Sequence, residues 1–60
     1  MNTVCIDFMD CSVQMYENVQ HISYEHGEMV LTIDGKFTWI KLHDICQFSV
    51  FQSEEAPYGT

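Results

Sequence analysis

A candidate set of transition-metal ligands consists of His21, His26 and His43 together with Cys46. Imidazole nitrogens and thiolates are natural ligands for such ions. Protein metal sites usually repeat a short, regular ligand spacing, whereas the spacing of these four residues is irregular. The pattern is typical of polar surface histidines. We therefore predict no bound metal and no cofactor.

A pair of carboxylates, Glu25 and Glu28, flanks the dipeptide His26-Gly27. Two carboxylates that face each other can share a proton or hold Ca²⁺. The strand pairing predicted below also places Lys41 opposite Glu28. A solvated ion pair between Lys41 and Glu28, with Glu25 as an additional carboxylate, therefore explains these three residues better than a functional site does. Such a pair is worth well under about 1 kcal/mol.

Catalytic motifs are absent from the sequence. It contains no phosphate-binding loop, no nucleophile elbow, no zinc-protease motif and no dinucleotide-binding glycine set. A chain of 60 residues built from short strands also leaves little interior for a substrate pocket of roughly 300 Å³ or more. We predict that the protein is not an enzyme.

The charge balance is strongly acidic, with nine Asp or Glu residues against two Lys residues and a net charge of −7. Affinity for nucleic acids comes mostly from Lys and Arg, so direct binding to DNA, RNA or an anionic membrane is disfavoured. The charge favours solubility and a partner protein with a basic surface. Solubility alone is the simpler explanation.

The length allows one small domain, because half of this chain would fall below the usual folding limit of about 40 residues. We expect a single β domain over residues 1–52 and a flexible acidic tail over residues 53–60. The cysteines, Cys5, Cys11 and Cys46, are an odd number without paired spacing, which indicates reduced thiols. No signal peptide or long apolar run is present, so we expect a cytoplasmic protein.

Apolar residues alternate with polar ones along residues 3–9 and again from residue 13, which is the period of a half-buried strand. A two-residue loop at Asp10-Cys11 would join these segments into a hairpin. A longer loop that includes Ser12 is the alternative, because Cys11 stands where glycine usually supplies a positive φ. The shorter loop would place Phe8 opposite Val13 and Ile6 opposite Met15, all on one face.

Two further hairpins are predicted at His26-Gly27 and Asp34-Gly35. Counting outward from each turn assigns every residue to one of two faces. The predicted core face contains Ile22, Tyr24, Met29, Leu31, Ile33, Ile40 and Leu42. The opposite face contains His21, Ser23, Val30, Thr32, Phe37, Trp39 and Lys41.

The predicted fold is all-β, a single small antiparallel meander of five or six strands, curled or barrel-like. At most one short helical turn is expected near residues 43–46, before a last strand around Phe48 and Val50. A helix over residues 10–21, capped by Asp10 or Ser12, is the main alternative, although its apolar spacing is thinner than the strand alternation.

Trp39, Phe37 and Val30, with His21 beside them, form the most informative cluster. Aromatic side chains on the face away from the core mark interfaces more often than scattered apolar residues do. The alternative is that a closed barrel or the last strand covers them. We predict that this cluster is a partner or self interface, with Trp39 at a contact between chains of a homo-oligomer, most simply a dimer.

Three segments of the chain, FMDCSVQMYENV, ISYEHGEMVLTIDGKFTWIKL and HDICQFSVF, together resemble a pattern in short all-β accessory proteins of Gram-positive bacteria and their phages. The resemblance covers Ile6 to Phe51, and Cys11 replaces the glycine expected in the first turn. It implies a phage or mobile-element accessory protein, and it carries no catalytic residue.

The expected function is that of an acidic protein-binding module. The size, the charge and the resemblance together fit a phage-encoded inhibitor of a host nucleic-acid-handling or defence machine, acting in the host cytoplasm by surface occupation or phosphate mimicry. One alternative is an assembly subunit that pairs through its sheet edge. Another is an oligomer that sequesters a small ligand between protomers, beside Trp39 and Phe37. The residues expected to form the acidic binding surface are Asp7, Asp10, Glu17, Glu25, Glu28 and Asp34.

Overall fold

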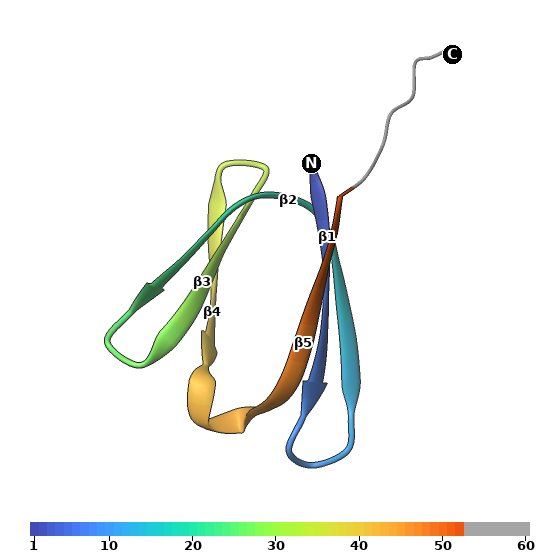
Figure 1. Cartoon of the computed structure of the whole chain (residues 1–60). Helices are drawn as coiled ribbons and strands as arrows, with labels where there is room; N and C mark the ends of the chain where they lie inside the picture. Colours follow the sequence, from blue (N-terminus) through green and yellow to red (C-terminus); the bar gives the residue numbers. More distant parts are fainter. Residues whose placement is uncertain (53–60) are drawn as a thin grey trace.

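A computed structural model describes residues 1–52, which form one antiparallel sheet of five strands in the order β4-β3-β2-β1-β5 (Figure 1). The predicted all-β class is confirmed, and the sheet is not closed into a barrel. The predicted tail, residues 53–60, lies outside the described residues. The elements are β1 (Asn2–Phe8), β2 (Val13–Glu25), β3 (Glu28–Ile33), β4 (Lys36–Lys41), the 3-10 turn η1 (Leu42–Asp44) and β5 (Ile45–Gln52).

The last strand departs from a simple meander. A meander would place β5 beside β4, but β5 pairs with β1 instead, from Asn2 opposite Gln52 to Phe8 opposite Ile45. The turn η1 carries the chain across, slightly earlier in the sequence than the predicted helical turn near residues 43–46. Strands β4 and β5 are therefore the two edges of the described sheet.

The hairpins on either side of β3 have the predicted two-residue loops. The four loop residues have positive φ angles: 49° at His26, 77° at Gly27, 53° at Asp34 and 76° at Gly35. Positive φ at both loop positions matches the right-handed twist of the flanking strands. The predicted registers are confirmed, with Ile22 opposite Leu31, Tyr24 opposite Met29, Leu31 opposite Thr38 and Met29 opposite Ile40.

The register of the first hairpin differs from the prediction by one residue. The N–H of Phe8 donates to the Ser12 carbonyl at 2.8 Å, and the N–H of Cys11 donates to the Phe8 carbonyl at 3.0 Å. The loop therefore contains three residues, Met9, Asp10 and Cys11, and Cys11 has a φ of 75°. It is longer than the predicted two residues, but the added residue is Met9 and not Ser12. A shift of one residue reverses the faces, and Val13 and Met15 are exposed opposite Asp7 and Cys5.

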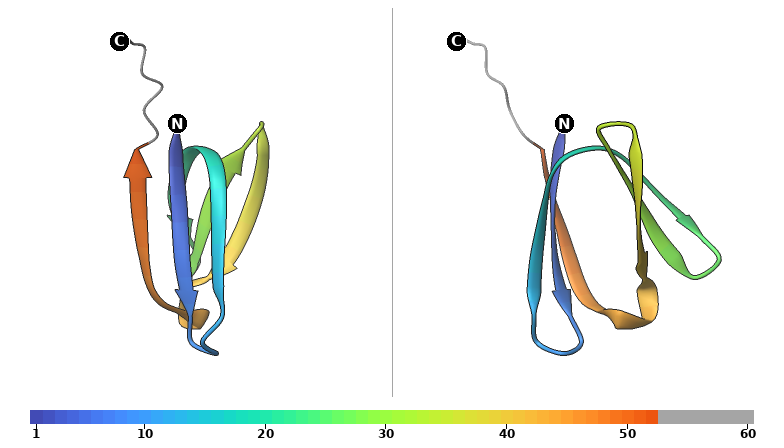
Figure 2. Two further views of the ribbon diagram at one scale, coloured as in Figure 1. Left: turned by 90° about the vertical axis from the view of Figure 1, so that its right-hand side faces the viewer. Right: turned by 180° about the vertical axis from the view of Figure 1, so that it is seen from behind.

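Strand β2 is long and strongly bent, so it serves both halves of the sheet. Asn18 has a φ of 60°, and the pairing of β2 shifts register on both sides of Val19, the next residue. Its first part pairs with β1 and its last part pairs with β3. Figures 1 and 2 show the strand arching over the molecule, so that the two halves face each other. The alternative of a helix over residues 10–21 is wrong, because residues 13–25 are extended.

The core lies between these two halves. Val19 is fully buried at the bend, where it pairs with Asn2 on one side and Ile33 on the other. Tyr24 and Leu42, both predicted in the core, are exposed. Tyr24 lies beside a turn that projects away from β1 and β5 (Figure 2), and Leu42 belongs to η1. The buried cluster consists of Val4, Ile6, Val19, Met29, Leu31 and Ile40.

The helical content of residues 1–52 is limited to the three residues of η1, and no described helix could span a membrane.

Candidate interaction surface

The outer face of β4 carries two large aromatic side chains. Phe37 and Trp39 are two residues apart on this strand, so they point to the same side, away from the core. The side chain of Trp39 is 50% exposed and that of Phe37 is 65% exposed. We call this pair the β4 face. His21 lies exposed on the same side of the sheet, two strands away, with Thr32 of β3 between it and Phe37.

Val30 lies on the predicted side of the sheet but is buried, with 4% exposure. It occupies the middle of β3, directly between Ser23 of β2 and Trp39 of β4. Cross-strand neighbours on one face lie within about 5.5 Å of each other, so a tryptophan opposite a small branched residue can shield it from water. Val30 therefore lies beside Trp39 on the same face and offers little surface of its own to a partner.

The β4 face has charged residues at both ends. At one end Glu25, Glu28 and Lys41 form a row across β2, β3 and β4, as the sequence predicted. At the other end Asp34 forms the turn before β4, where the Gly35 N–H donates to the side-chain oxygen of Gln20 at 3.2 Å. An apolar centre is thus flanked by carboxylates, which is the arrangement of a polar rim around a contact site.

The remaining acidic residues lie elsewhere. Asp7 is on the outer side of β1 and accepts a 2.7 Å hydrogen bond from Gln47 Nε2 of β5. Glu17 is exposed on β2 close to the bend, and Asp10 is in the β1–β2 loop. This loop and the Asp34 turn lie at opposite ends of the molecule (Figure 1). Of the six predicted acidic residues, the fold brings Glu25 and Glu28 together and leaves the others apart.

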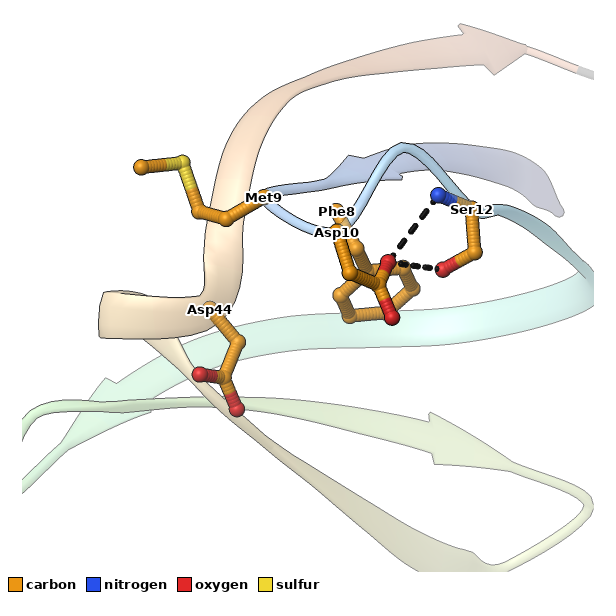
Figure 3. A pocket seen from close by; sticks show the side chains of 5 residues that line it. All are labelled: Phe8, Met9, Asp10, Ser12 and Asp44. Atoms are coloured by element: carbon orange, nitrogen blue, oxygen red, sulfur yellow. Dashed lines mark hydrogen bonds between the residues drawn. The ribbon is translucent and has the colours of Figure 1, made fainter.

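A hollow of about 390 Å³ lies between the β1–β2 loop and η1, and Figure 3 shows its lining. The N–H and the hydroxyl of Ser12 donate to Asp10 Oδ1 at 3.0 Å and 2.6 Å. The N–H of Met9 donates to the Asp44 carbonyl at 2.8 Å, which ties the loop to η1. The residues that line the hollow are Phe8, Met9, Asp10, Ser12 and Asp44.

The hydrogen bonds from the Ser12 hydroxyl and N–H hold the pKa of Asp10 below its ordinary value of 3.8. A carboxylate stabilised in this way is a weak base near neutral pH. The pair therefore braces the loop, and nothing in its geometry favours catalysis.

Metal-ligand geometry is not found within residues 1–52, where no three His, Cys, Asp or Glu side chains come together. Cys5, Cys11 and Cys46 are all free thiols, with Cys5 half-buried and the other two exposed.

Comparison with known proteins gives no relative: no protein-family model, curated protein or solved structure matches the chain. The chain is therefore assigned to no family, and its candidate surfaces are defined by its own geometry.

One apolar surface was missed by the sequence prediction. Phe48, Val50 and Phe51 of the edge strand β5 are all exposed. The signal for it is present in the sequence, because residues 45–52 contain no charged side chain in an otherwise acidic protein.

Proposed function

We propose that this protein is a non-enzymatic, acidic binding module whose β4 face docks onto a partner protein with a basic surface. The observation that carries this proposal is the exposure of Trp39 and Phe37 side by side on an edge strand. Exposed aromatic residues of this kind supply most of the binding energy at many interfaces. Contact between grouped apolar side chains and water is also unfavourable, so such a group on the surface of a small protein usually marks an interaction site.

The charge of −7 supports a basic partner, because it steers oppositely charged surfaces together before contact. Glu28 and Asp34 lie near the two ends of the β4 face and would contribute most directly. Only Glu25 and Glu28 of the six acidic residues lie together. This scatter favours surface occupation over phosphate mimicry, since imitation of a nucleic-acid strand needs carboxylates in a regular line. From the resemblance stated above, we propose a host nucleic-acid-handling or defence protein as the target, inhibited in the cytoplasm.

The test is capture of the partner by the tagged protein, followed by calorimetric titration with the purified partner. Trp39→Ala should weaken binding by about 30-fold, which corresponds to about 2 kcal/mol at an interface centre. Raising the salt concentration should weaken the wild-type complex further by slowing association.

Met15→Ala is the matched control, because Met15 is an exposed apolar residue on the outer side of the other half of the sheet. It should leave the affinity unchanged. Loss of binding in Met15→Ala together with full binding in Trp39→Ala would contradict the proposal.

A further inference from the structure

The edge formed by β5 lacks the protection that exposed strands usually have. Within residues 1–52, β5 pairs with β1 on one side and with no strand on the other. Its sequence, ICQFSVFQ, contains no charged residue and no Pro. Natural proteins protect free edges with such residues, because unpaired backbone groups recruit another strand. The opposite edge, β4, follows this rule, with Lys36 and Lys41 at its ends.

Several apolar side chains of β5 are also exposed, and a strand paired with the free edge of β5 would cover them. Phe48 and Val50 point to the core side, opposite Ile6 and Val4 of β1, yet they are 39% and 46% exposed. Phe51 points outward and is 57% exposed. Core-facing residues remain open to water here because the described sheet ends at β5.

We propose that β5 pairs antiparallel with β5 of a second copy, joining two five-stranded sheets into one continuous sheet. A two-fold axis at Ser49 places Phe48 opposite the partner's Val50, and Val50 opposite the partner's Phe48. Directly opposed residues of an antiparallel pair share a face, so these four apolar side chains cover one another on the core side. The strand is therefore complementary to itself in this register.

The uncharged sequence of β5 and its self-complementary register favour a second copy as the occupant. Two chains that each carry −7 repel each other, so they can meet closely only where no carboxylate lies, and β5 contains none. A basic partner gains nothing from an uncharged edge. Pairing of β5 with β4 of another copy would be head-to-tail and would generate an open chain of molecules, whereas pairing of β5 with itself closes as a dimer.

This inference does not depend on the proposed function. The dimer uses β5 and leaves the β4 face free, so failure of partner binding and failure of dimerisation are separate results.

Sedimentation velocity at about 50 µM tests the proposal with a matched pair of variants. Phe51→Lys and Phe37→Lys each place a lysine on the outer side of an edge strand, at positions of similar exposure. We expect the wild type and Phe37→Lys to be dimers. Phe51→Lys should weaken dimerisation at least about tenfold, with unchanged circular dichroism.

Three results would overturn the β5 dimer: a monomeric wild type, a Phe51→Lys variant that dimerises fully, or a Phe37→Lys variant that dissociates. The last result would move the self-contact to the β4 face, where the sequence prediction placed it.

Cross-linking tests the register. In a background with Cys5→Ser, Cys11→Ser and Cys46→Ser, the variant Ser49→Cys should form a disulfide-linked dimer on mild oxidation, because the axis brings the two copies of residue 49 together. Gln47→Cys in the same background should not, since it lies opposite the partner's Phe51. Equal cross-linking of both variants, or none in either, would refute the proposed register.

Discussion

Cys11 occupies a backbone conformation that suits glycine. Its φ of 75° is imposed by the three-residue loop between β1 and β2, which needs a left-handed residue at this point to close. A side chain with a Cβ atom is strained there by roughly 1–2 kcal/mol. This strain lies in an exposed loop whose geometry is held by Asp10 and Ser12.

Cys11→Gly should therefore raise the free energy of unfolding by about 1 kcal/mol, because it removes the strain that the Cβ atom causes. Urea denaturation measures the change. Gly35→Val is the opposite control: a Cβ atom at Gly35 would meet no atom within 4 Å, so only its φ of 76° opposes the substitution. That variant should lose on the order of 1 kcal/mol or more. An unchanged midpoint in both would contradict this account.

Asp10 should make stability depend on acid pH. Its folded-state pKa is lowered, chiefly by the Ser12 hydroxyl, so the ionised form stabilises the fold above pH 3.8, and the contribution is lost as pH falls through the folded pKa. The wild type should exceed Asp10→Asn in urea stability at about pH 5, and this advantage should shrink as the pH is lowered below 3.8.

Ser12→Ala provides the control for that experiment, since it removes the hydroxyl donor. In the Ser12→Ala background the advantage of Asp10 over Asn at about pH 5 should shrink. An undiminished advantage would assign the effect to another group.

Local turn chemistry explains why some elements could be predicted from the sequence and others could not. His26-Gly27 and Asp34-Gly35 are short turn signals between alternating strands, so they determine three strands and their registers without tertiary information. Cys11 carries no such signal, because a cysteine at positive φ cannot be distinguished from any other loop residue. The first register was therefore missed by one position.

The bend in β2 and the place of β5 depend on contacts between distant residues. Asn18 looks like any polar strand residue, and nothing near Val19 shows that it will be buried between two halves. The same holds for the β4 face: counting assigned Val30, Phe37 and Trp39 to one side correctly, but only the packing shows that Val30 is buried.

Val19 is the residue on which the bent strand depends most. It is fully buried and pairs with β1 and β3 at once. Val19→Ala should lower the free energy of unfolding by about 2 kcal/mol, through two lost methyl groups and the cavity that they leave. Val13→Ala, on the exposed part of the same strand, should change it by less than about 0.5 kcal/mol. Chemical denaturation of both variants makes the comparison.

At the scale of the whole molecule, the two edges of the sheet have different character. Strand β4 presents aromatic side chains between lysines, and β5 presents an uncharged backbone edge. A β5-linked dimer would carry two β4 faces. A partner with two basic sites within reach would then be held by both, and its apparent affinity would exceed that of either contact alone.

Because β5 pairs with β1, the first and last described residues of the sheet, Asn2 and Gln52, lie opposite each other. A chain in which the strands follow one another in a different order could therefore form the same sheet. A circular permutant that joins residue 52 to residue 2 through a short Gly/Ser linker, and opens at Asp34-Gly35, should keep the same circular dichroism. In that permutant β1 and β5 become neighbours in sequence, while β3 and β4 move to opposite ends of the chain. One long-range pairing therefore replaces another, and the rate in stopped-flow refolding should stay close to that of the wild type.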